Sequence, residues 1–167
     1  MSVYAEQMNE QIQQTVQRAH ELAIEHGITL ATAESLTSGD LAGTICTVSG
    51  ASAYFMGGVV SYASSVKASV LGVSETLLAQ AGSVDARVAQ QMAAGAARVC
   101  GAQYALSTTG VAGPEPHDGK PVGTVFIGLS TPEGVLAREY SFEGDRAAIR
   151  AQSVLAALTV LVEALEA

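Results

Sequence analysis

The sequence has no tryptophan, and it has only two cysteines, two lysines and three histidines among 167 residues. Cys46 and Cys100 stand in apolar helical stretches without metal or redox spacing, so we interpret both as small core residues in a reducing cytoplasm. Basic residues are scarce, and the formal net charge is −8. Nucleic acids require a clustered basic surface and anionic membranes repel an acidic one, so we expect neither as a partner.

Long apolar runs are missing as well. No uninterrupted apolar stretch reaches membrane-spanning length, and the polar first residues do not resemble a signal peptide. Apolar residues nevertheless make up 49% of the chain, which is enough for a compact core. We therefore expect a single domain over residues 1–167, in which residues 1–7 form a loose N-terminal tail.

Helical and strand patterns alternate along the chain. We expect helices at 5–26, 37–47, 85–99 and 145–166, short helical turns at 67–71 and 75–80, and strands at 28–34, 57–62, 104–109, 122–130 and 135–142. The last two strands form a hairpin. Strands separated by helices predict the α/β class, here a three-layer α/β/α domain with a mixed, mostly parallel sheet.

Residues Thr32 to Asp40 join the first strand to the second helix through a turn rich in hydroxyl groups and glycine. Proteins of the α/β class place nucleophiles and anion-binding amides at such turns, where the helix N-terminus adds partial positive charge. Ser35 therefore stands where a reactive hydroxyl would be placed. It also stands where an ordinary helix N-cap would be, and caps are commoner than nucleophiles.

Lys67 stands out because the chain has only one other lysine, Lys120. A lysine can lose its proton where an arginine cannot, so Lys67 is a candidate general base; the alternative is a lysine that caps a short helix or extends along the surface. As a base it needs a pKa lowered from about 10.4 toward 7–8. Partial burial beside another cation, for which Arg146 is a candidate, would lower it.

The histidines do not suit a Ser-His-Asp triad. We expect His20 and His26 to be solvated on the first helix, and His117 lies in a loop where it could touch a ligand without being the base. No ligand-type side chains recur at metal spacing, so we expect no metal site. Ser-Lys is then the nucleophilic pair that the sequence offers.

Three further parts of the sequence are candidates for the site, and each allows more than one interpretation. The small residues at 108–114 follow a strand, where they hold a phosphate or carboxylate or form only a tight turn. Arg146 opens the last helix, where it clamps a phosphate or lies exposed beside an Asp145 N-cap. Ser52, between helix and strand, competes with Ser35 for the role of nucleophile.

These segments occur in the order found in the CinA C-terminal domain family, which is related to the competence/damage-inducible protein CinA. The chain resembles this family from about residue 8 to 166, and six ordered motifs make the resemblance specific. The motifs are Ala33-Glu34-Ser35-Leu36-Thr37-Ser38-Gly39, Gly50-Ala51-Ser52, Gly57-Gly58-Val59-Val60-Ser61-Tyr62 with Lys67, Thr109-Gly110-Val111-Ala112-Gly113-Pro114, Lys120-Pro121-Val122-Gly123-Thr124-Val125, and Gly144-Asp145-Arg146.

The resemblance implies an amidase that hydrolyses a small-molecule nucleotide, nicotinamide mononucleotide, to nicotinate mononucleotide and ammonia in pyridine-nucleotide salvage. It also implies a homodimer without metal or other cofactor. Lys67 would take the proton of Ser35, which attacks the carboxamide, and Tyr62 would relay the proton or orient Lys67. The substrate- and oxyanion-binding residues implied are Thr37, Ser38, Gly39, Ser52, Thr109, Gly110 and Arg146.

The chain departs from the family pattern at several positions. The family's first motif reads Glu-Ser-Cys-Thr-Gly-Gly, where this chain has Leu36 and Ser38, and Asp85 replaces a serine. Ser38 adds a side chain to the turn, and Asp85 adds negative charge near the expected anion site. These changes motivate the alternative, a non-catalytic module that binds a pyridine nucleotide or docks onto a partner. A DNA-linked role, suggested by the family's historical name, conflicts with the acidic composition.

Overall fold

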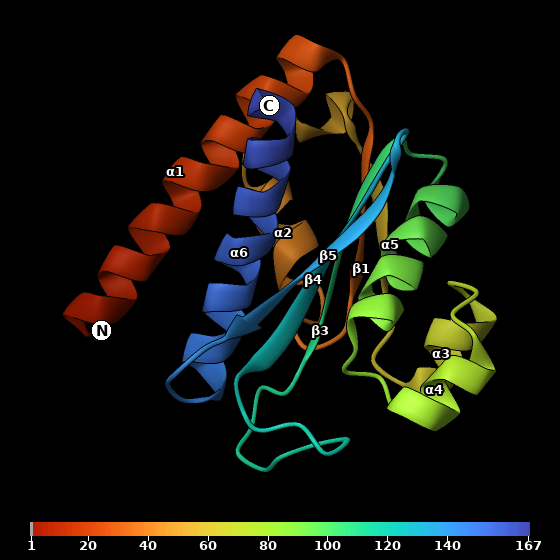
Figure 1. Cartoon of the computed structure of the whole chain (residues 1–167). Coiled ribbons are helices and arrows are strands. Elements are labelled where there is room, and N and C mark those ends of the chain that lie inside the picture. The colour runs from red at the N-terminus through yellow and green to blue at the C-terminus, as the bar shows by residue number, and fades with distance from the viewer. Residues whose placement is uncertain (1) are drawn as a thin grey trace.

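The computed structural model describes residues 2–167, and it consists of one five-stranded sheet between two layers of helices (Figure 1). The strands are β1 (Leu30–Glu34), β2 (Phe55–Val60), β3 (Tyr104–Gly110), β4 (Thr124–Thr131) and β5 (Gly134–Ser141). The helices are α1 (Val3–His26), α2 (Asp40–Cys46), α3 (Ser64–Ser69), α4 (Glu75–Ala81), α5 (Ala86–Cys100) and α6 (Arg146–Glu166), with a 3-10 turn η1 at Ala51–Ala53.

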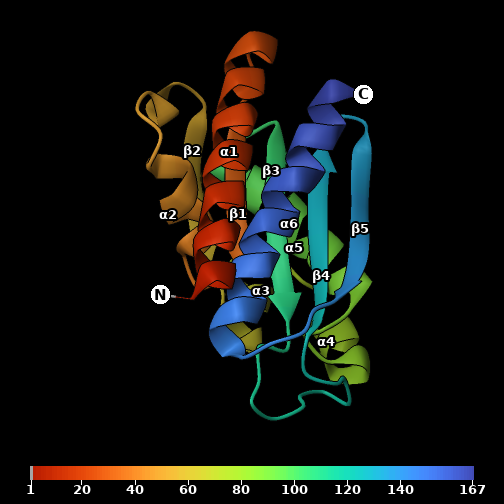
Figure 2. The ribbon, with the colours of Figure 1, turned by 90° about the vertical axis from the view of Figure 1, so that its left-hand side faces the viewer.

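The strand order across the sheet is β2-β1-β3-β4-β5. β1 pairs in parallel with β2 and β3, whereas β4 is antiparallel to both β3 and β5. β4 is thus the one strand of the sheet that runs against the other four. Helices α1, α2 and α6 cover the face seen in Figure 2, and α5 covers the other. The predicted α/β/α fold with a mixed sheet is confirmed.

Alternate strand residues supply the cores on the two faces of the sheet, as the two-residue period of a strand requires. In β3, Leu106 belongs to the core cluster that contains Leu158 of α6, while Ala105 belongs to the cluster on the other face that contains Met92 of α5. Among the described helices α6 is long and apolar enough to cross a membrane, a feature that the sequence search for an uninterrupted run overlooked. Its buried face packs on α1 and the sheet, as that of a core helix does.

Several local expectations are confirmed. Asp85 and Asp145 are the N-caps of α5 and α6, and each side chain accepts a main-chain N–H of the first turn. Gly27 and Gly101 end α1 and α5 in the left-handed conformation, where a residue without Cβ is not strained. The hairpin forms between β4 and β5.

Other expectations were wrong. Most of the expected tail is helical, because α1 begins at Val3; Met1 lies outside the described residues. β2 ends at Val60, so Tyr62 follows the strand instead of closing it. Cys46 is exposed and Cys100 half-buried, so neither is a fully buried core residue. His20 is partly buried, with its ring edge-on to Tyr54.

Candidate active site

Ser35 lies in the turn at the carboxyl end of β1, where its N–H donates to the carbonyl of Thr108 on β3 (3.0 Å). It is buried but is not a helix cap, because the N-cap of α2 is Gly39, which has no side chain to accept a bond. Of the two readings that the sequence left open, the cap is therefore wrong. The hydroxyl of Ser35 is therefore not used in capping α2 and is available for other contacts.

Glu34 takes over the capping of α2, a role that sequence reasoning missed. Its buried carboxylate accepts the N–H of Leu41 (2.8 Å) and of Ala42 (3.0 Å), and also the hydroxyl of Thr37 (2.6 Å). A carboxylate at a helix N-terminus is stabilised by the free N–H groups and by the helix dipole. These bonds fix both ends of the turn that carries Ser35.

Lys67 lies on α3, which follows β2, and its side chain is 1% exposed. Nζ is 3.0 Å from the hydroxyl oxygen of Ser35, 2.7 Å from the carbonyl oxygen of Ser61 and 3.0 Å from that of Tyr62. Burial lowers the pKa of Lys67 from 10.5 to about 8, and the negative charge of Asp118 opposes this shift. Burial, not the expected neighbouring Arg146, is thus the cause of the lowered pKa.

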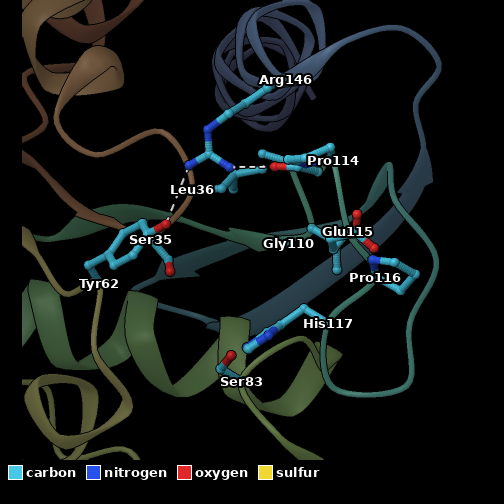
Figure 3. A pocket seen from close by; sticks show the side chains of 13 residues that line it. Ser35, Leu36, Tyr62, Ser83, Gly110, Pro114, Glu115, Pro116, His117 and Arg146 are labelled. Carbon is cyan, nitrogen blue, oxygen red and sulfur yellow. Dashed lines mark hydrogen bonds between the residues drawn. The ribbon is translucent and has the colours of Figure 1, made fainter.

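Tyr62 contacts Lys67 through its main-chain carbonyl and not through its phenol. The side chain is 61% exposed, and its hydroxyl lies 3.3 Å from Nη2 of Arg146. Arg146 also donates from Nη1 to the carbonyl of Gly113 (2.7 Å), so it joins the loop after β3 to the segment after β2 (Figure 3). A phenolic proton relay between Tyr62 and Lys67 is not built into this arrangement.

A cavity of about 290 Å³ opens beside the Ser35 hydroxyl. Ser35, Leu36 and Tyr62 line it from one side, and Arg146 and the loop after β3 line it from the other (Figure 3). The remaining lining residues are Ser83, Gly110, Val111, Ala112, Gly113, Pro114, Glu115, Pro116 and His117. The cavity lies at the carboxyl ends of β1, β2 and β3, the position at which open α/β sheets bind ligands.

The other residues expected at the site lie outside this cavity. Thr37 and Thr109 are buried side chains, of which Thr37 bonds to Glu34 and Thr109 to the carbonyl of Ser83 (2.6 Å). Ser38 accepts a bond from Arg150 (2.9 Å), and Gly39 lines a separate groove toward α1 and α6.

Ser52 lies at the opposite edge of the sheet from Ser35, because it precedes β2 whereas Ser35 follows the parallel strand β1. It lines another cavity, with Cys46 and Phe55, and is not near Lys67. Among residues 2–167, no three His, Cys, Asp or Glu side chains cluster in a way that would hold a metal ion.

Comparison with known proteins gives a consistent family. The model of the CinA C-terminal domain matches residues 10–165. The CinA-like protein of Frankia casuarinae is 53% identical over 140 residues, which cover 84% of this chain and 32% of that protein. The CinA-like protein of Geobacter metallireducens is 48% identical over 135 residues, covering 80% and 33%. The chain thus spans about a third of the length of these curated relatives.

Solved structures show the same fold along nearly the whole chain. The competence-damaged protein (CinA) superfamily protein of Klebsiella pneumoniae is 33% identical with a TM-score of 0.90, covering 93% of this chain and 98% of its own. The competence/damage inducible protein of Agrobacterium tumefaciens is 34% identical with a TM-score of 0.89, covering 94% and 96%. The chain therefore belongs to the CinA C-terminal domain family.

Proposed function

We propose that this chain is a nicotinamide-nucleotide amidase in which Ser35 is the nucleophile and Lys67 the general base. The geometry around Nζ of Lys67 carries the proposal. A neutral amine has two N–H donors and one lone pair, and the carbonyls of Ser61 and Tyr62 accept the two donors. The lone pair is then left for the hydroxyl of Ser35 at 3.0 Å, the arrangement in which Lys67 accepts the proton.

The reaction proceeds by acyl transfer. Lys67 takes the hydroxyl proton of Ser35 while Oγ attacks the carboxamide carbon, and the main-chain N–H of Leu36, which lines the cavity, stabilises the oxyanion. Ammonia leaves with a proton returned by Lys67, which breaks the C–N bond and leaves an ester on Ser35. Water activated by the same amine then hydrolyses the ester, so amide and water yield carboxylate and ammonium.

Nicotinamide mononucleotide is the proposed substrate because the family resemblance names it and because the cavity holds an anion-binding side chain. Arg146 faces the cavity with a planar guanidinium suited to a phosphate. Residues 110–113 line the same cavity. We extend the proposal to a cytoplasmic homodimer that uses no cofactor in pyridine-nucleotide salvage.

The alternative of a binding module without chemistry receives no support from the residues that motivated it. Ser38 and Asp85 do not line the cavity. Ser38 bonds to Arg150, and Asp85 caps α5 while bonding to Arg87 (3.0 Å). Both departures therefore leave the Ser35–Lys67 pair intact.

Ammonia release from nicotinamide mononucleotide tests the proposal. We expect release by the wild-type protein, none by Ser35→Ala or Lys67→Met, and an unchanged rate in Ser52→Ala, which serves as the matched serine control. Thermal shift with the nucleotide, recorded in parallel, reports binding. Full activity in Ser35→Ala or Lys67→Met would refute the pair, loss only in Ser52→Ala would move the nucleophile, and wild-type binding without turnover would favour the module.

A further inference from the structure

Asp118 fastens the loop that forms one wall of the cavity. Its Oδ2 accepts the main-chain N–H of Ser83 (2.8 Å) and the hydroxyl of Ser83 (3.0 Å). Ser83 lies between α4 and α5, two residues before the N-cap of α5, and itself lines the cavity. Asp118 adopts a left-handed backbone conformation (φ 50°), which is uncommon for a residue with a side chain. The loop backbone is therefore locally strained at Asp118, the residue that bonds to Ser83.

The neighbours of Asp118 are shaped to receive it. A Cβ at Gly82 would lie 2.6 Å from Cγ of Asp118, so a glycine leaves the space that the carboxylate fills. Ser83 is held from its other side, because the buried hydroxyl of Thr109 on β3 donates to its carbonyl (2.6 Å). Asp118 thus ties the loop to a point that is fixed on the central sheet.

The charge of Asp118 also acts on the catalytic pair. The titratable groups that act on its carboxylate are His117, with Nε2 3.4 Å from Oδ2, and Lys67. Burial works to raise the pKa of Asp118, but the bonds from Ser83 and these two neighbours lower it overall, so the group is an anion at neutral pH. For Lys67, Asp118 is the acidic group whose charge acts against the effect of burial on its pKa.

We propose that Asp118 is a positioning residue of the amidase: it fastens the loop of residues 110–121 against Ser83 and sets the electrostatic environment of Lys67. This inference rests on the proposed function for its kinetic consequences. The structural and electrostatic parts stand on the free protein alone, because the contacts of Asp118 do not involve a substrate. Two variants separate the parts: Asp118→Asn keeps an acceptor for Ser83 and removes the charge, whereas Asp118→Ala removes both.

The electrostatic part is read directly from lysine carbons. Labelling lysine with ¹³C at the ε position gives two signals, from Lys67 and Lys120, which makes assignment by Lys120→Arg simple. We expect the titration midpoint of Lys67 to fall in Asp118→Asn, because the opposing negative charge is gone. Glu133→Gln, in the exposed turn between β4 and β5, removes one acidic charge far from the site and leaves the midpoint in place. An unmoved midpoint in Asp118→Asn would overturn this part.

The fastening part is read from amide exchange and kinetics. In Asp118→Ala we expect faster hydrogen exchange at the Ser83 amide and a KM about tenfold higher, the loss expected for a charge-assisted bond. In Asp118→Asn we expect the exchange at the Ser83 amide to be slow again and the KM to be close to that of the wild type. Equal KM values in Asp118→Ala and wild type overturn the role, as does unchanged exchange. A wild-type protein that releases no ammonia would refute the proposed amidase activity instead. The lysine titration and the amide exchange would still test the role of Asp118 in that case.

Discussion

Lys67 and Ser35 are 32 residues apart in the sequence, yet Nζ of the one lies 3.0 Å from Oγ of the other. The pairing of β1 with β2 explains their approach. Ser35 directly follows β1, Lys67 lies on the short helix after β2, and the two strands are parallel neighbours whose carboxyl ends share one edge of the sheet. The N–H of Ser61 donates to the carbonyl of Glu34 (2.9 Å), which locks the two strand ends together.

We expect kcat/KM for ammonia release to rise with pH and to level off above about 8, because the reaction requires the neutral amine of Lys67 and burial lowers its pKa to about 8. Initial rates between pH 6 and 9.5 measure this rise of kcat/KM with pH. Lys120→Met, which replaces the other lysine, a residue outside the cavity, should show the same rise of kcat/KM with pH. A rate that is constant between pH 7 and 9 would contradict a lysine base.

Folding stability should depend on pH through the same group. The pKa of Lys67 is near 10.5 in the unfolded chain and about 8 in the folded protein, so between these values the unfolded state binds the additional proton. The free energy of unfolding therefore rises from pH 8 to 10.5, by about 3 kcal/mol from this group. Urea unfolding of wild type and Lys67→Met across this range isolates the effect, and parallel stability curves would show that Lys67 titrates normally.

Glu34→Gln should loosen the turn that carries Ser35. A glutamine has one oxygen and one NH₂ group, so its donor faces a main-chain N–H of Leu41 or Ala42 that now lacks an acceptor. We expect a loss of about 3 kcal/mol in unfolding free energy and a lower kcat. Denaturant unfolding and steady-state kinetics measure both, with Glu25→Gln, an exposed carboxylate of α1, as the control. Wild-type values for Glu34→Gln would show that the turn does not need the carboxylate.

Ser38→Gly should stabilise the protein slightly without changing the amidase rate. Ser38 has φ 45°, a conformation that costs a residue with a side chain about 1 kcal/mol. Arg150, which donates to Ser38, keeps its bonds to the carbonyl of Leu36 (2.9 Å) and to Asp40 (2.8 Å), so the lost bond is worth about half as much. Ser38→Ala retains the strain, so thermal unfolding should rank Gly above wild type and wild type above Ala. An inactive Ser38→Gly would place this residue at the substrate.

Much of the fold was predictable because its signals are local. Apolar runs and flanking glycines marked the strands, and Asp85 and Asp145 stand one residue before helical periodicity, where caps belong. Ser35 and Lys67 stood out as candidates because the proposed nucleophile and base need particular side chains. Ser52 remained a competitor of Ser35 in the sequence; the parallel pairing of β1 with β2 separates them, because Ser52 precedes β2 whereas Ser35 follows β1.

The parts of the site that sequence reasoning missed depend on main-chain atoms and on contacts distant in sequence. Tyr62 suggested a phenolic role, but a carbonyl, which any residue has, holds Lys67. Glu34 caps a helix that begins six residues later, beyond the spacing of ordinary caps. Asp118 and Ser83 are 35 positions apart in the sequence, and no spacing rule predicts their contact.

Gly95 of α5 closely approaches the main chain of Leu71, which follows α3, the helix that carries Lys67. A Cβ at Gly95 would lie within 2.8 Å of the carbonyl carbon and Cα of Leu71, which is main chain and cannot rotate away. Gly95→Ala must therefore displace the segment after α3 from α5. We expect a loss of about 1–3 kcal/mol in unfolding free energy, as overpacking of a core gives. Because misplacing a catalytic group by about 1 Å costs up to about a hundredfold, kcat should fall more than KM rises.

Gly43→Ala is the matched control, because a Cβ at Gly43 on α2 meets no atom within 4 Å. Alanine is a better helix former than glycine by about 0.5–1 kcal/mol, so this variant should be more stable than wild type and equally active. Glycine to alanine is thus expected to lower the unfolding free energy on α5 and to raise it on α2. If Gly95→Ala matched Gly43→Ala in denaturant unfolding and in kcat, the approach of α5 to Leu71 would not set the position of Lys67.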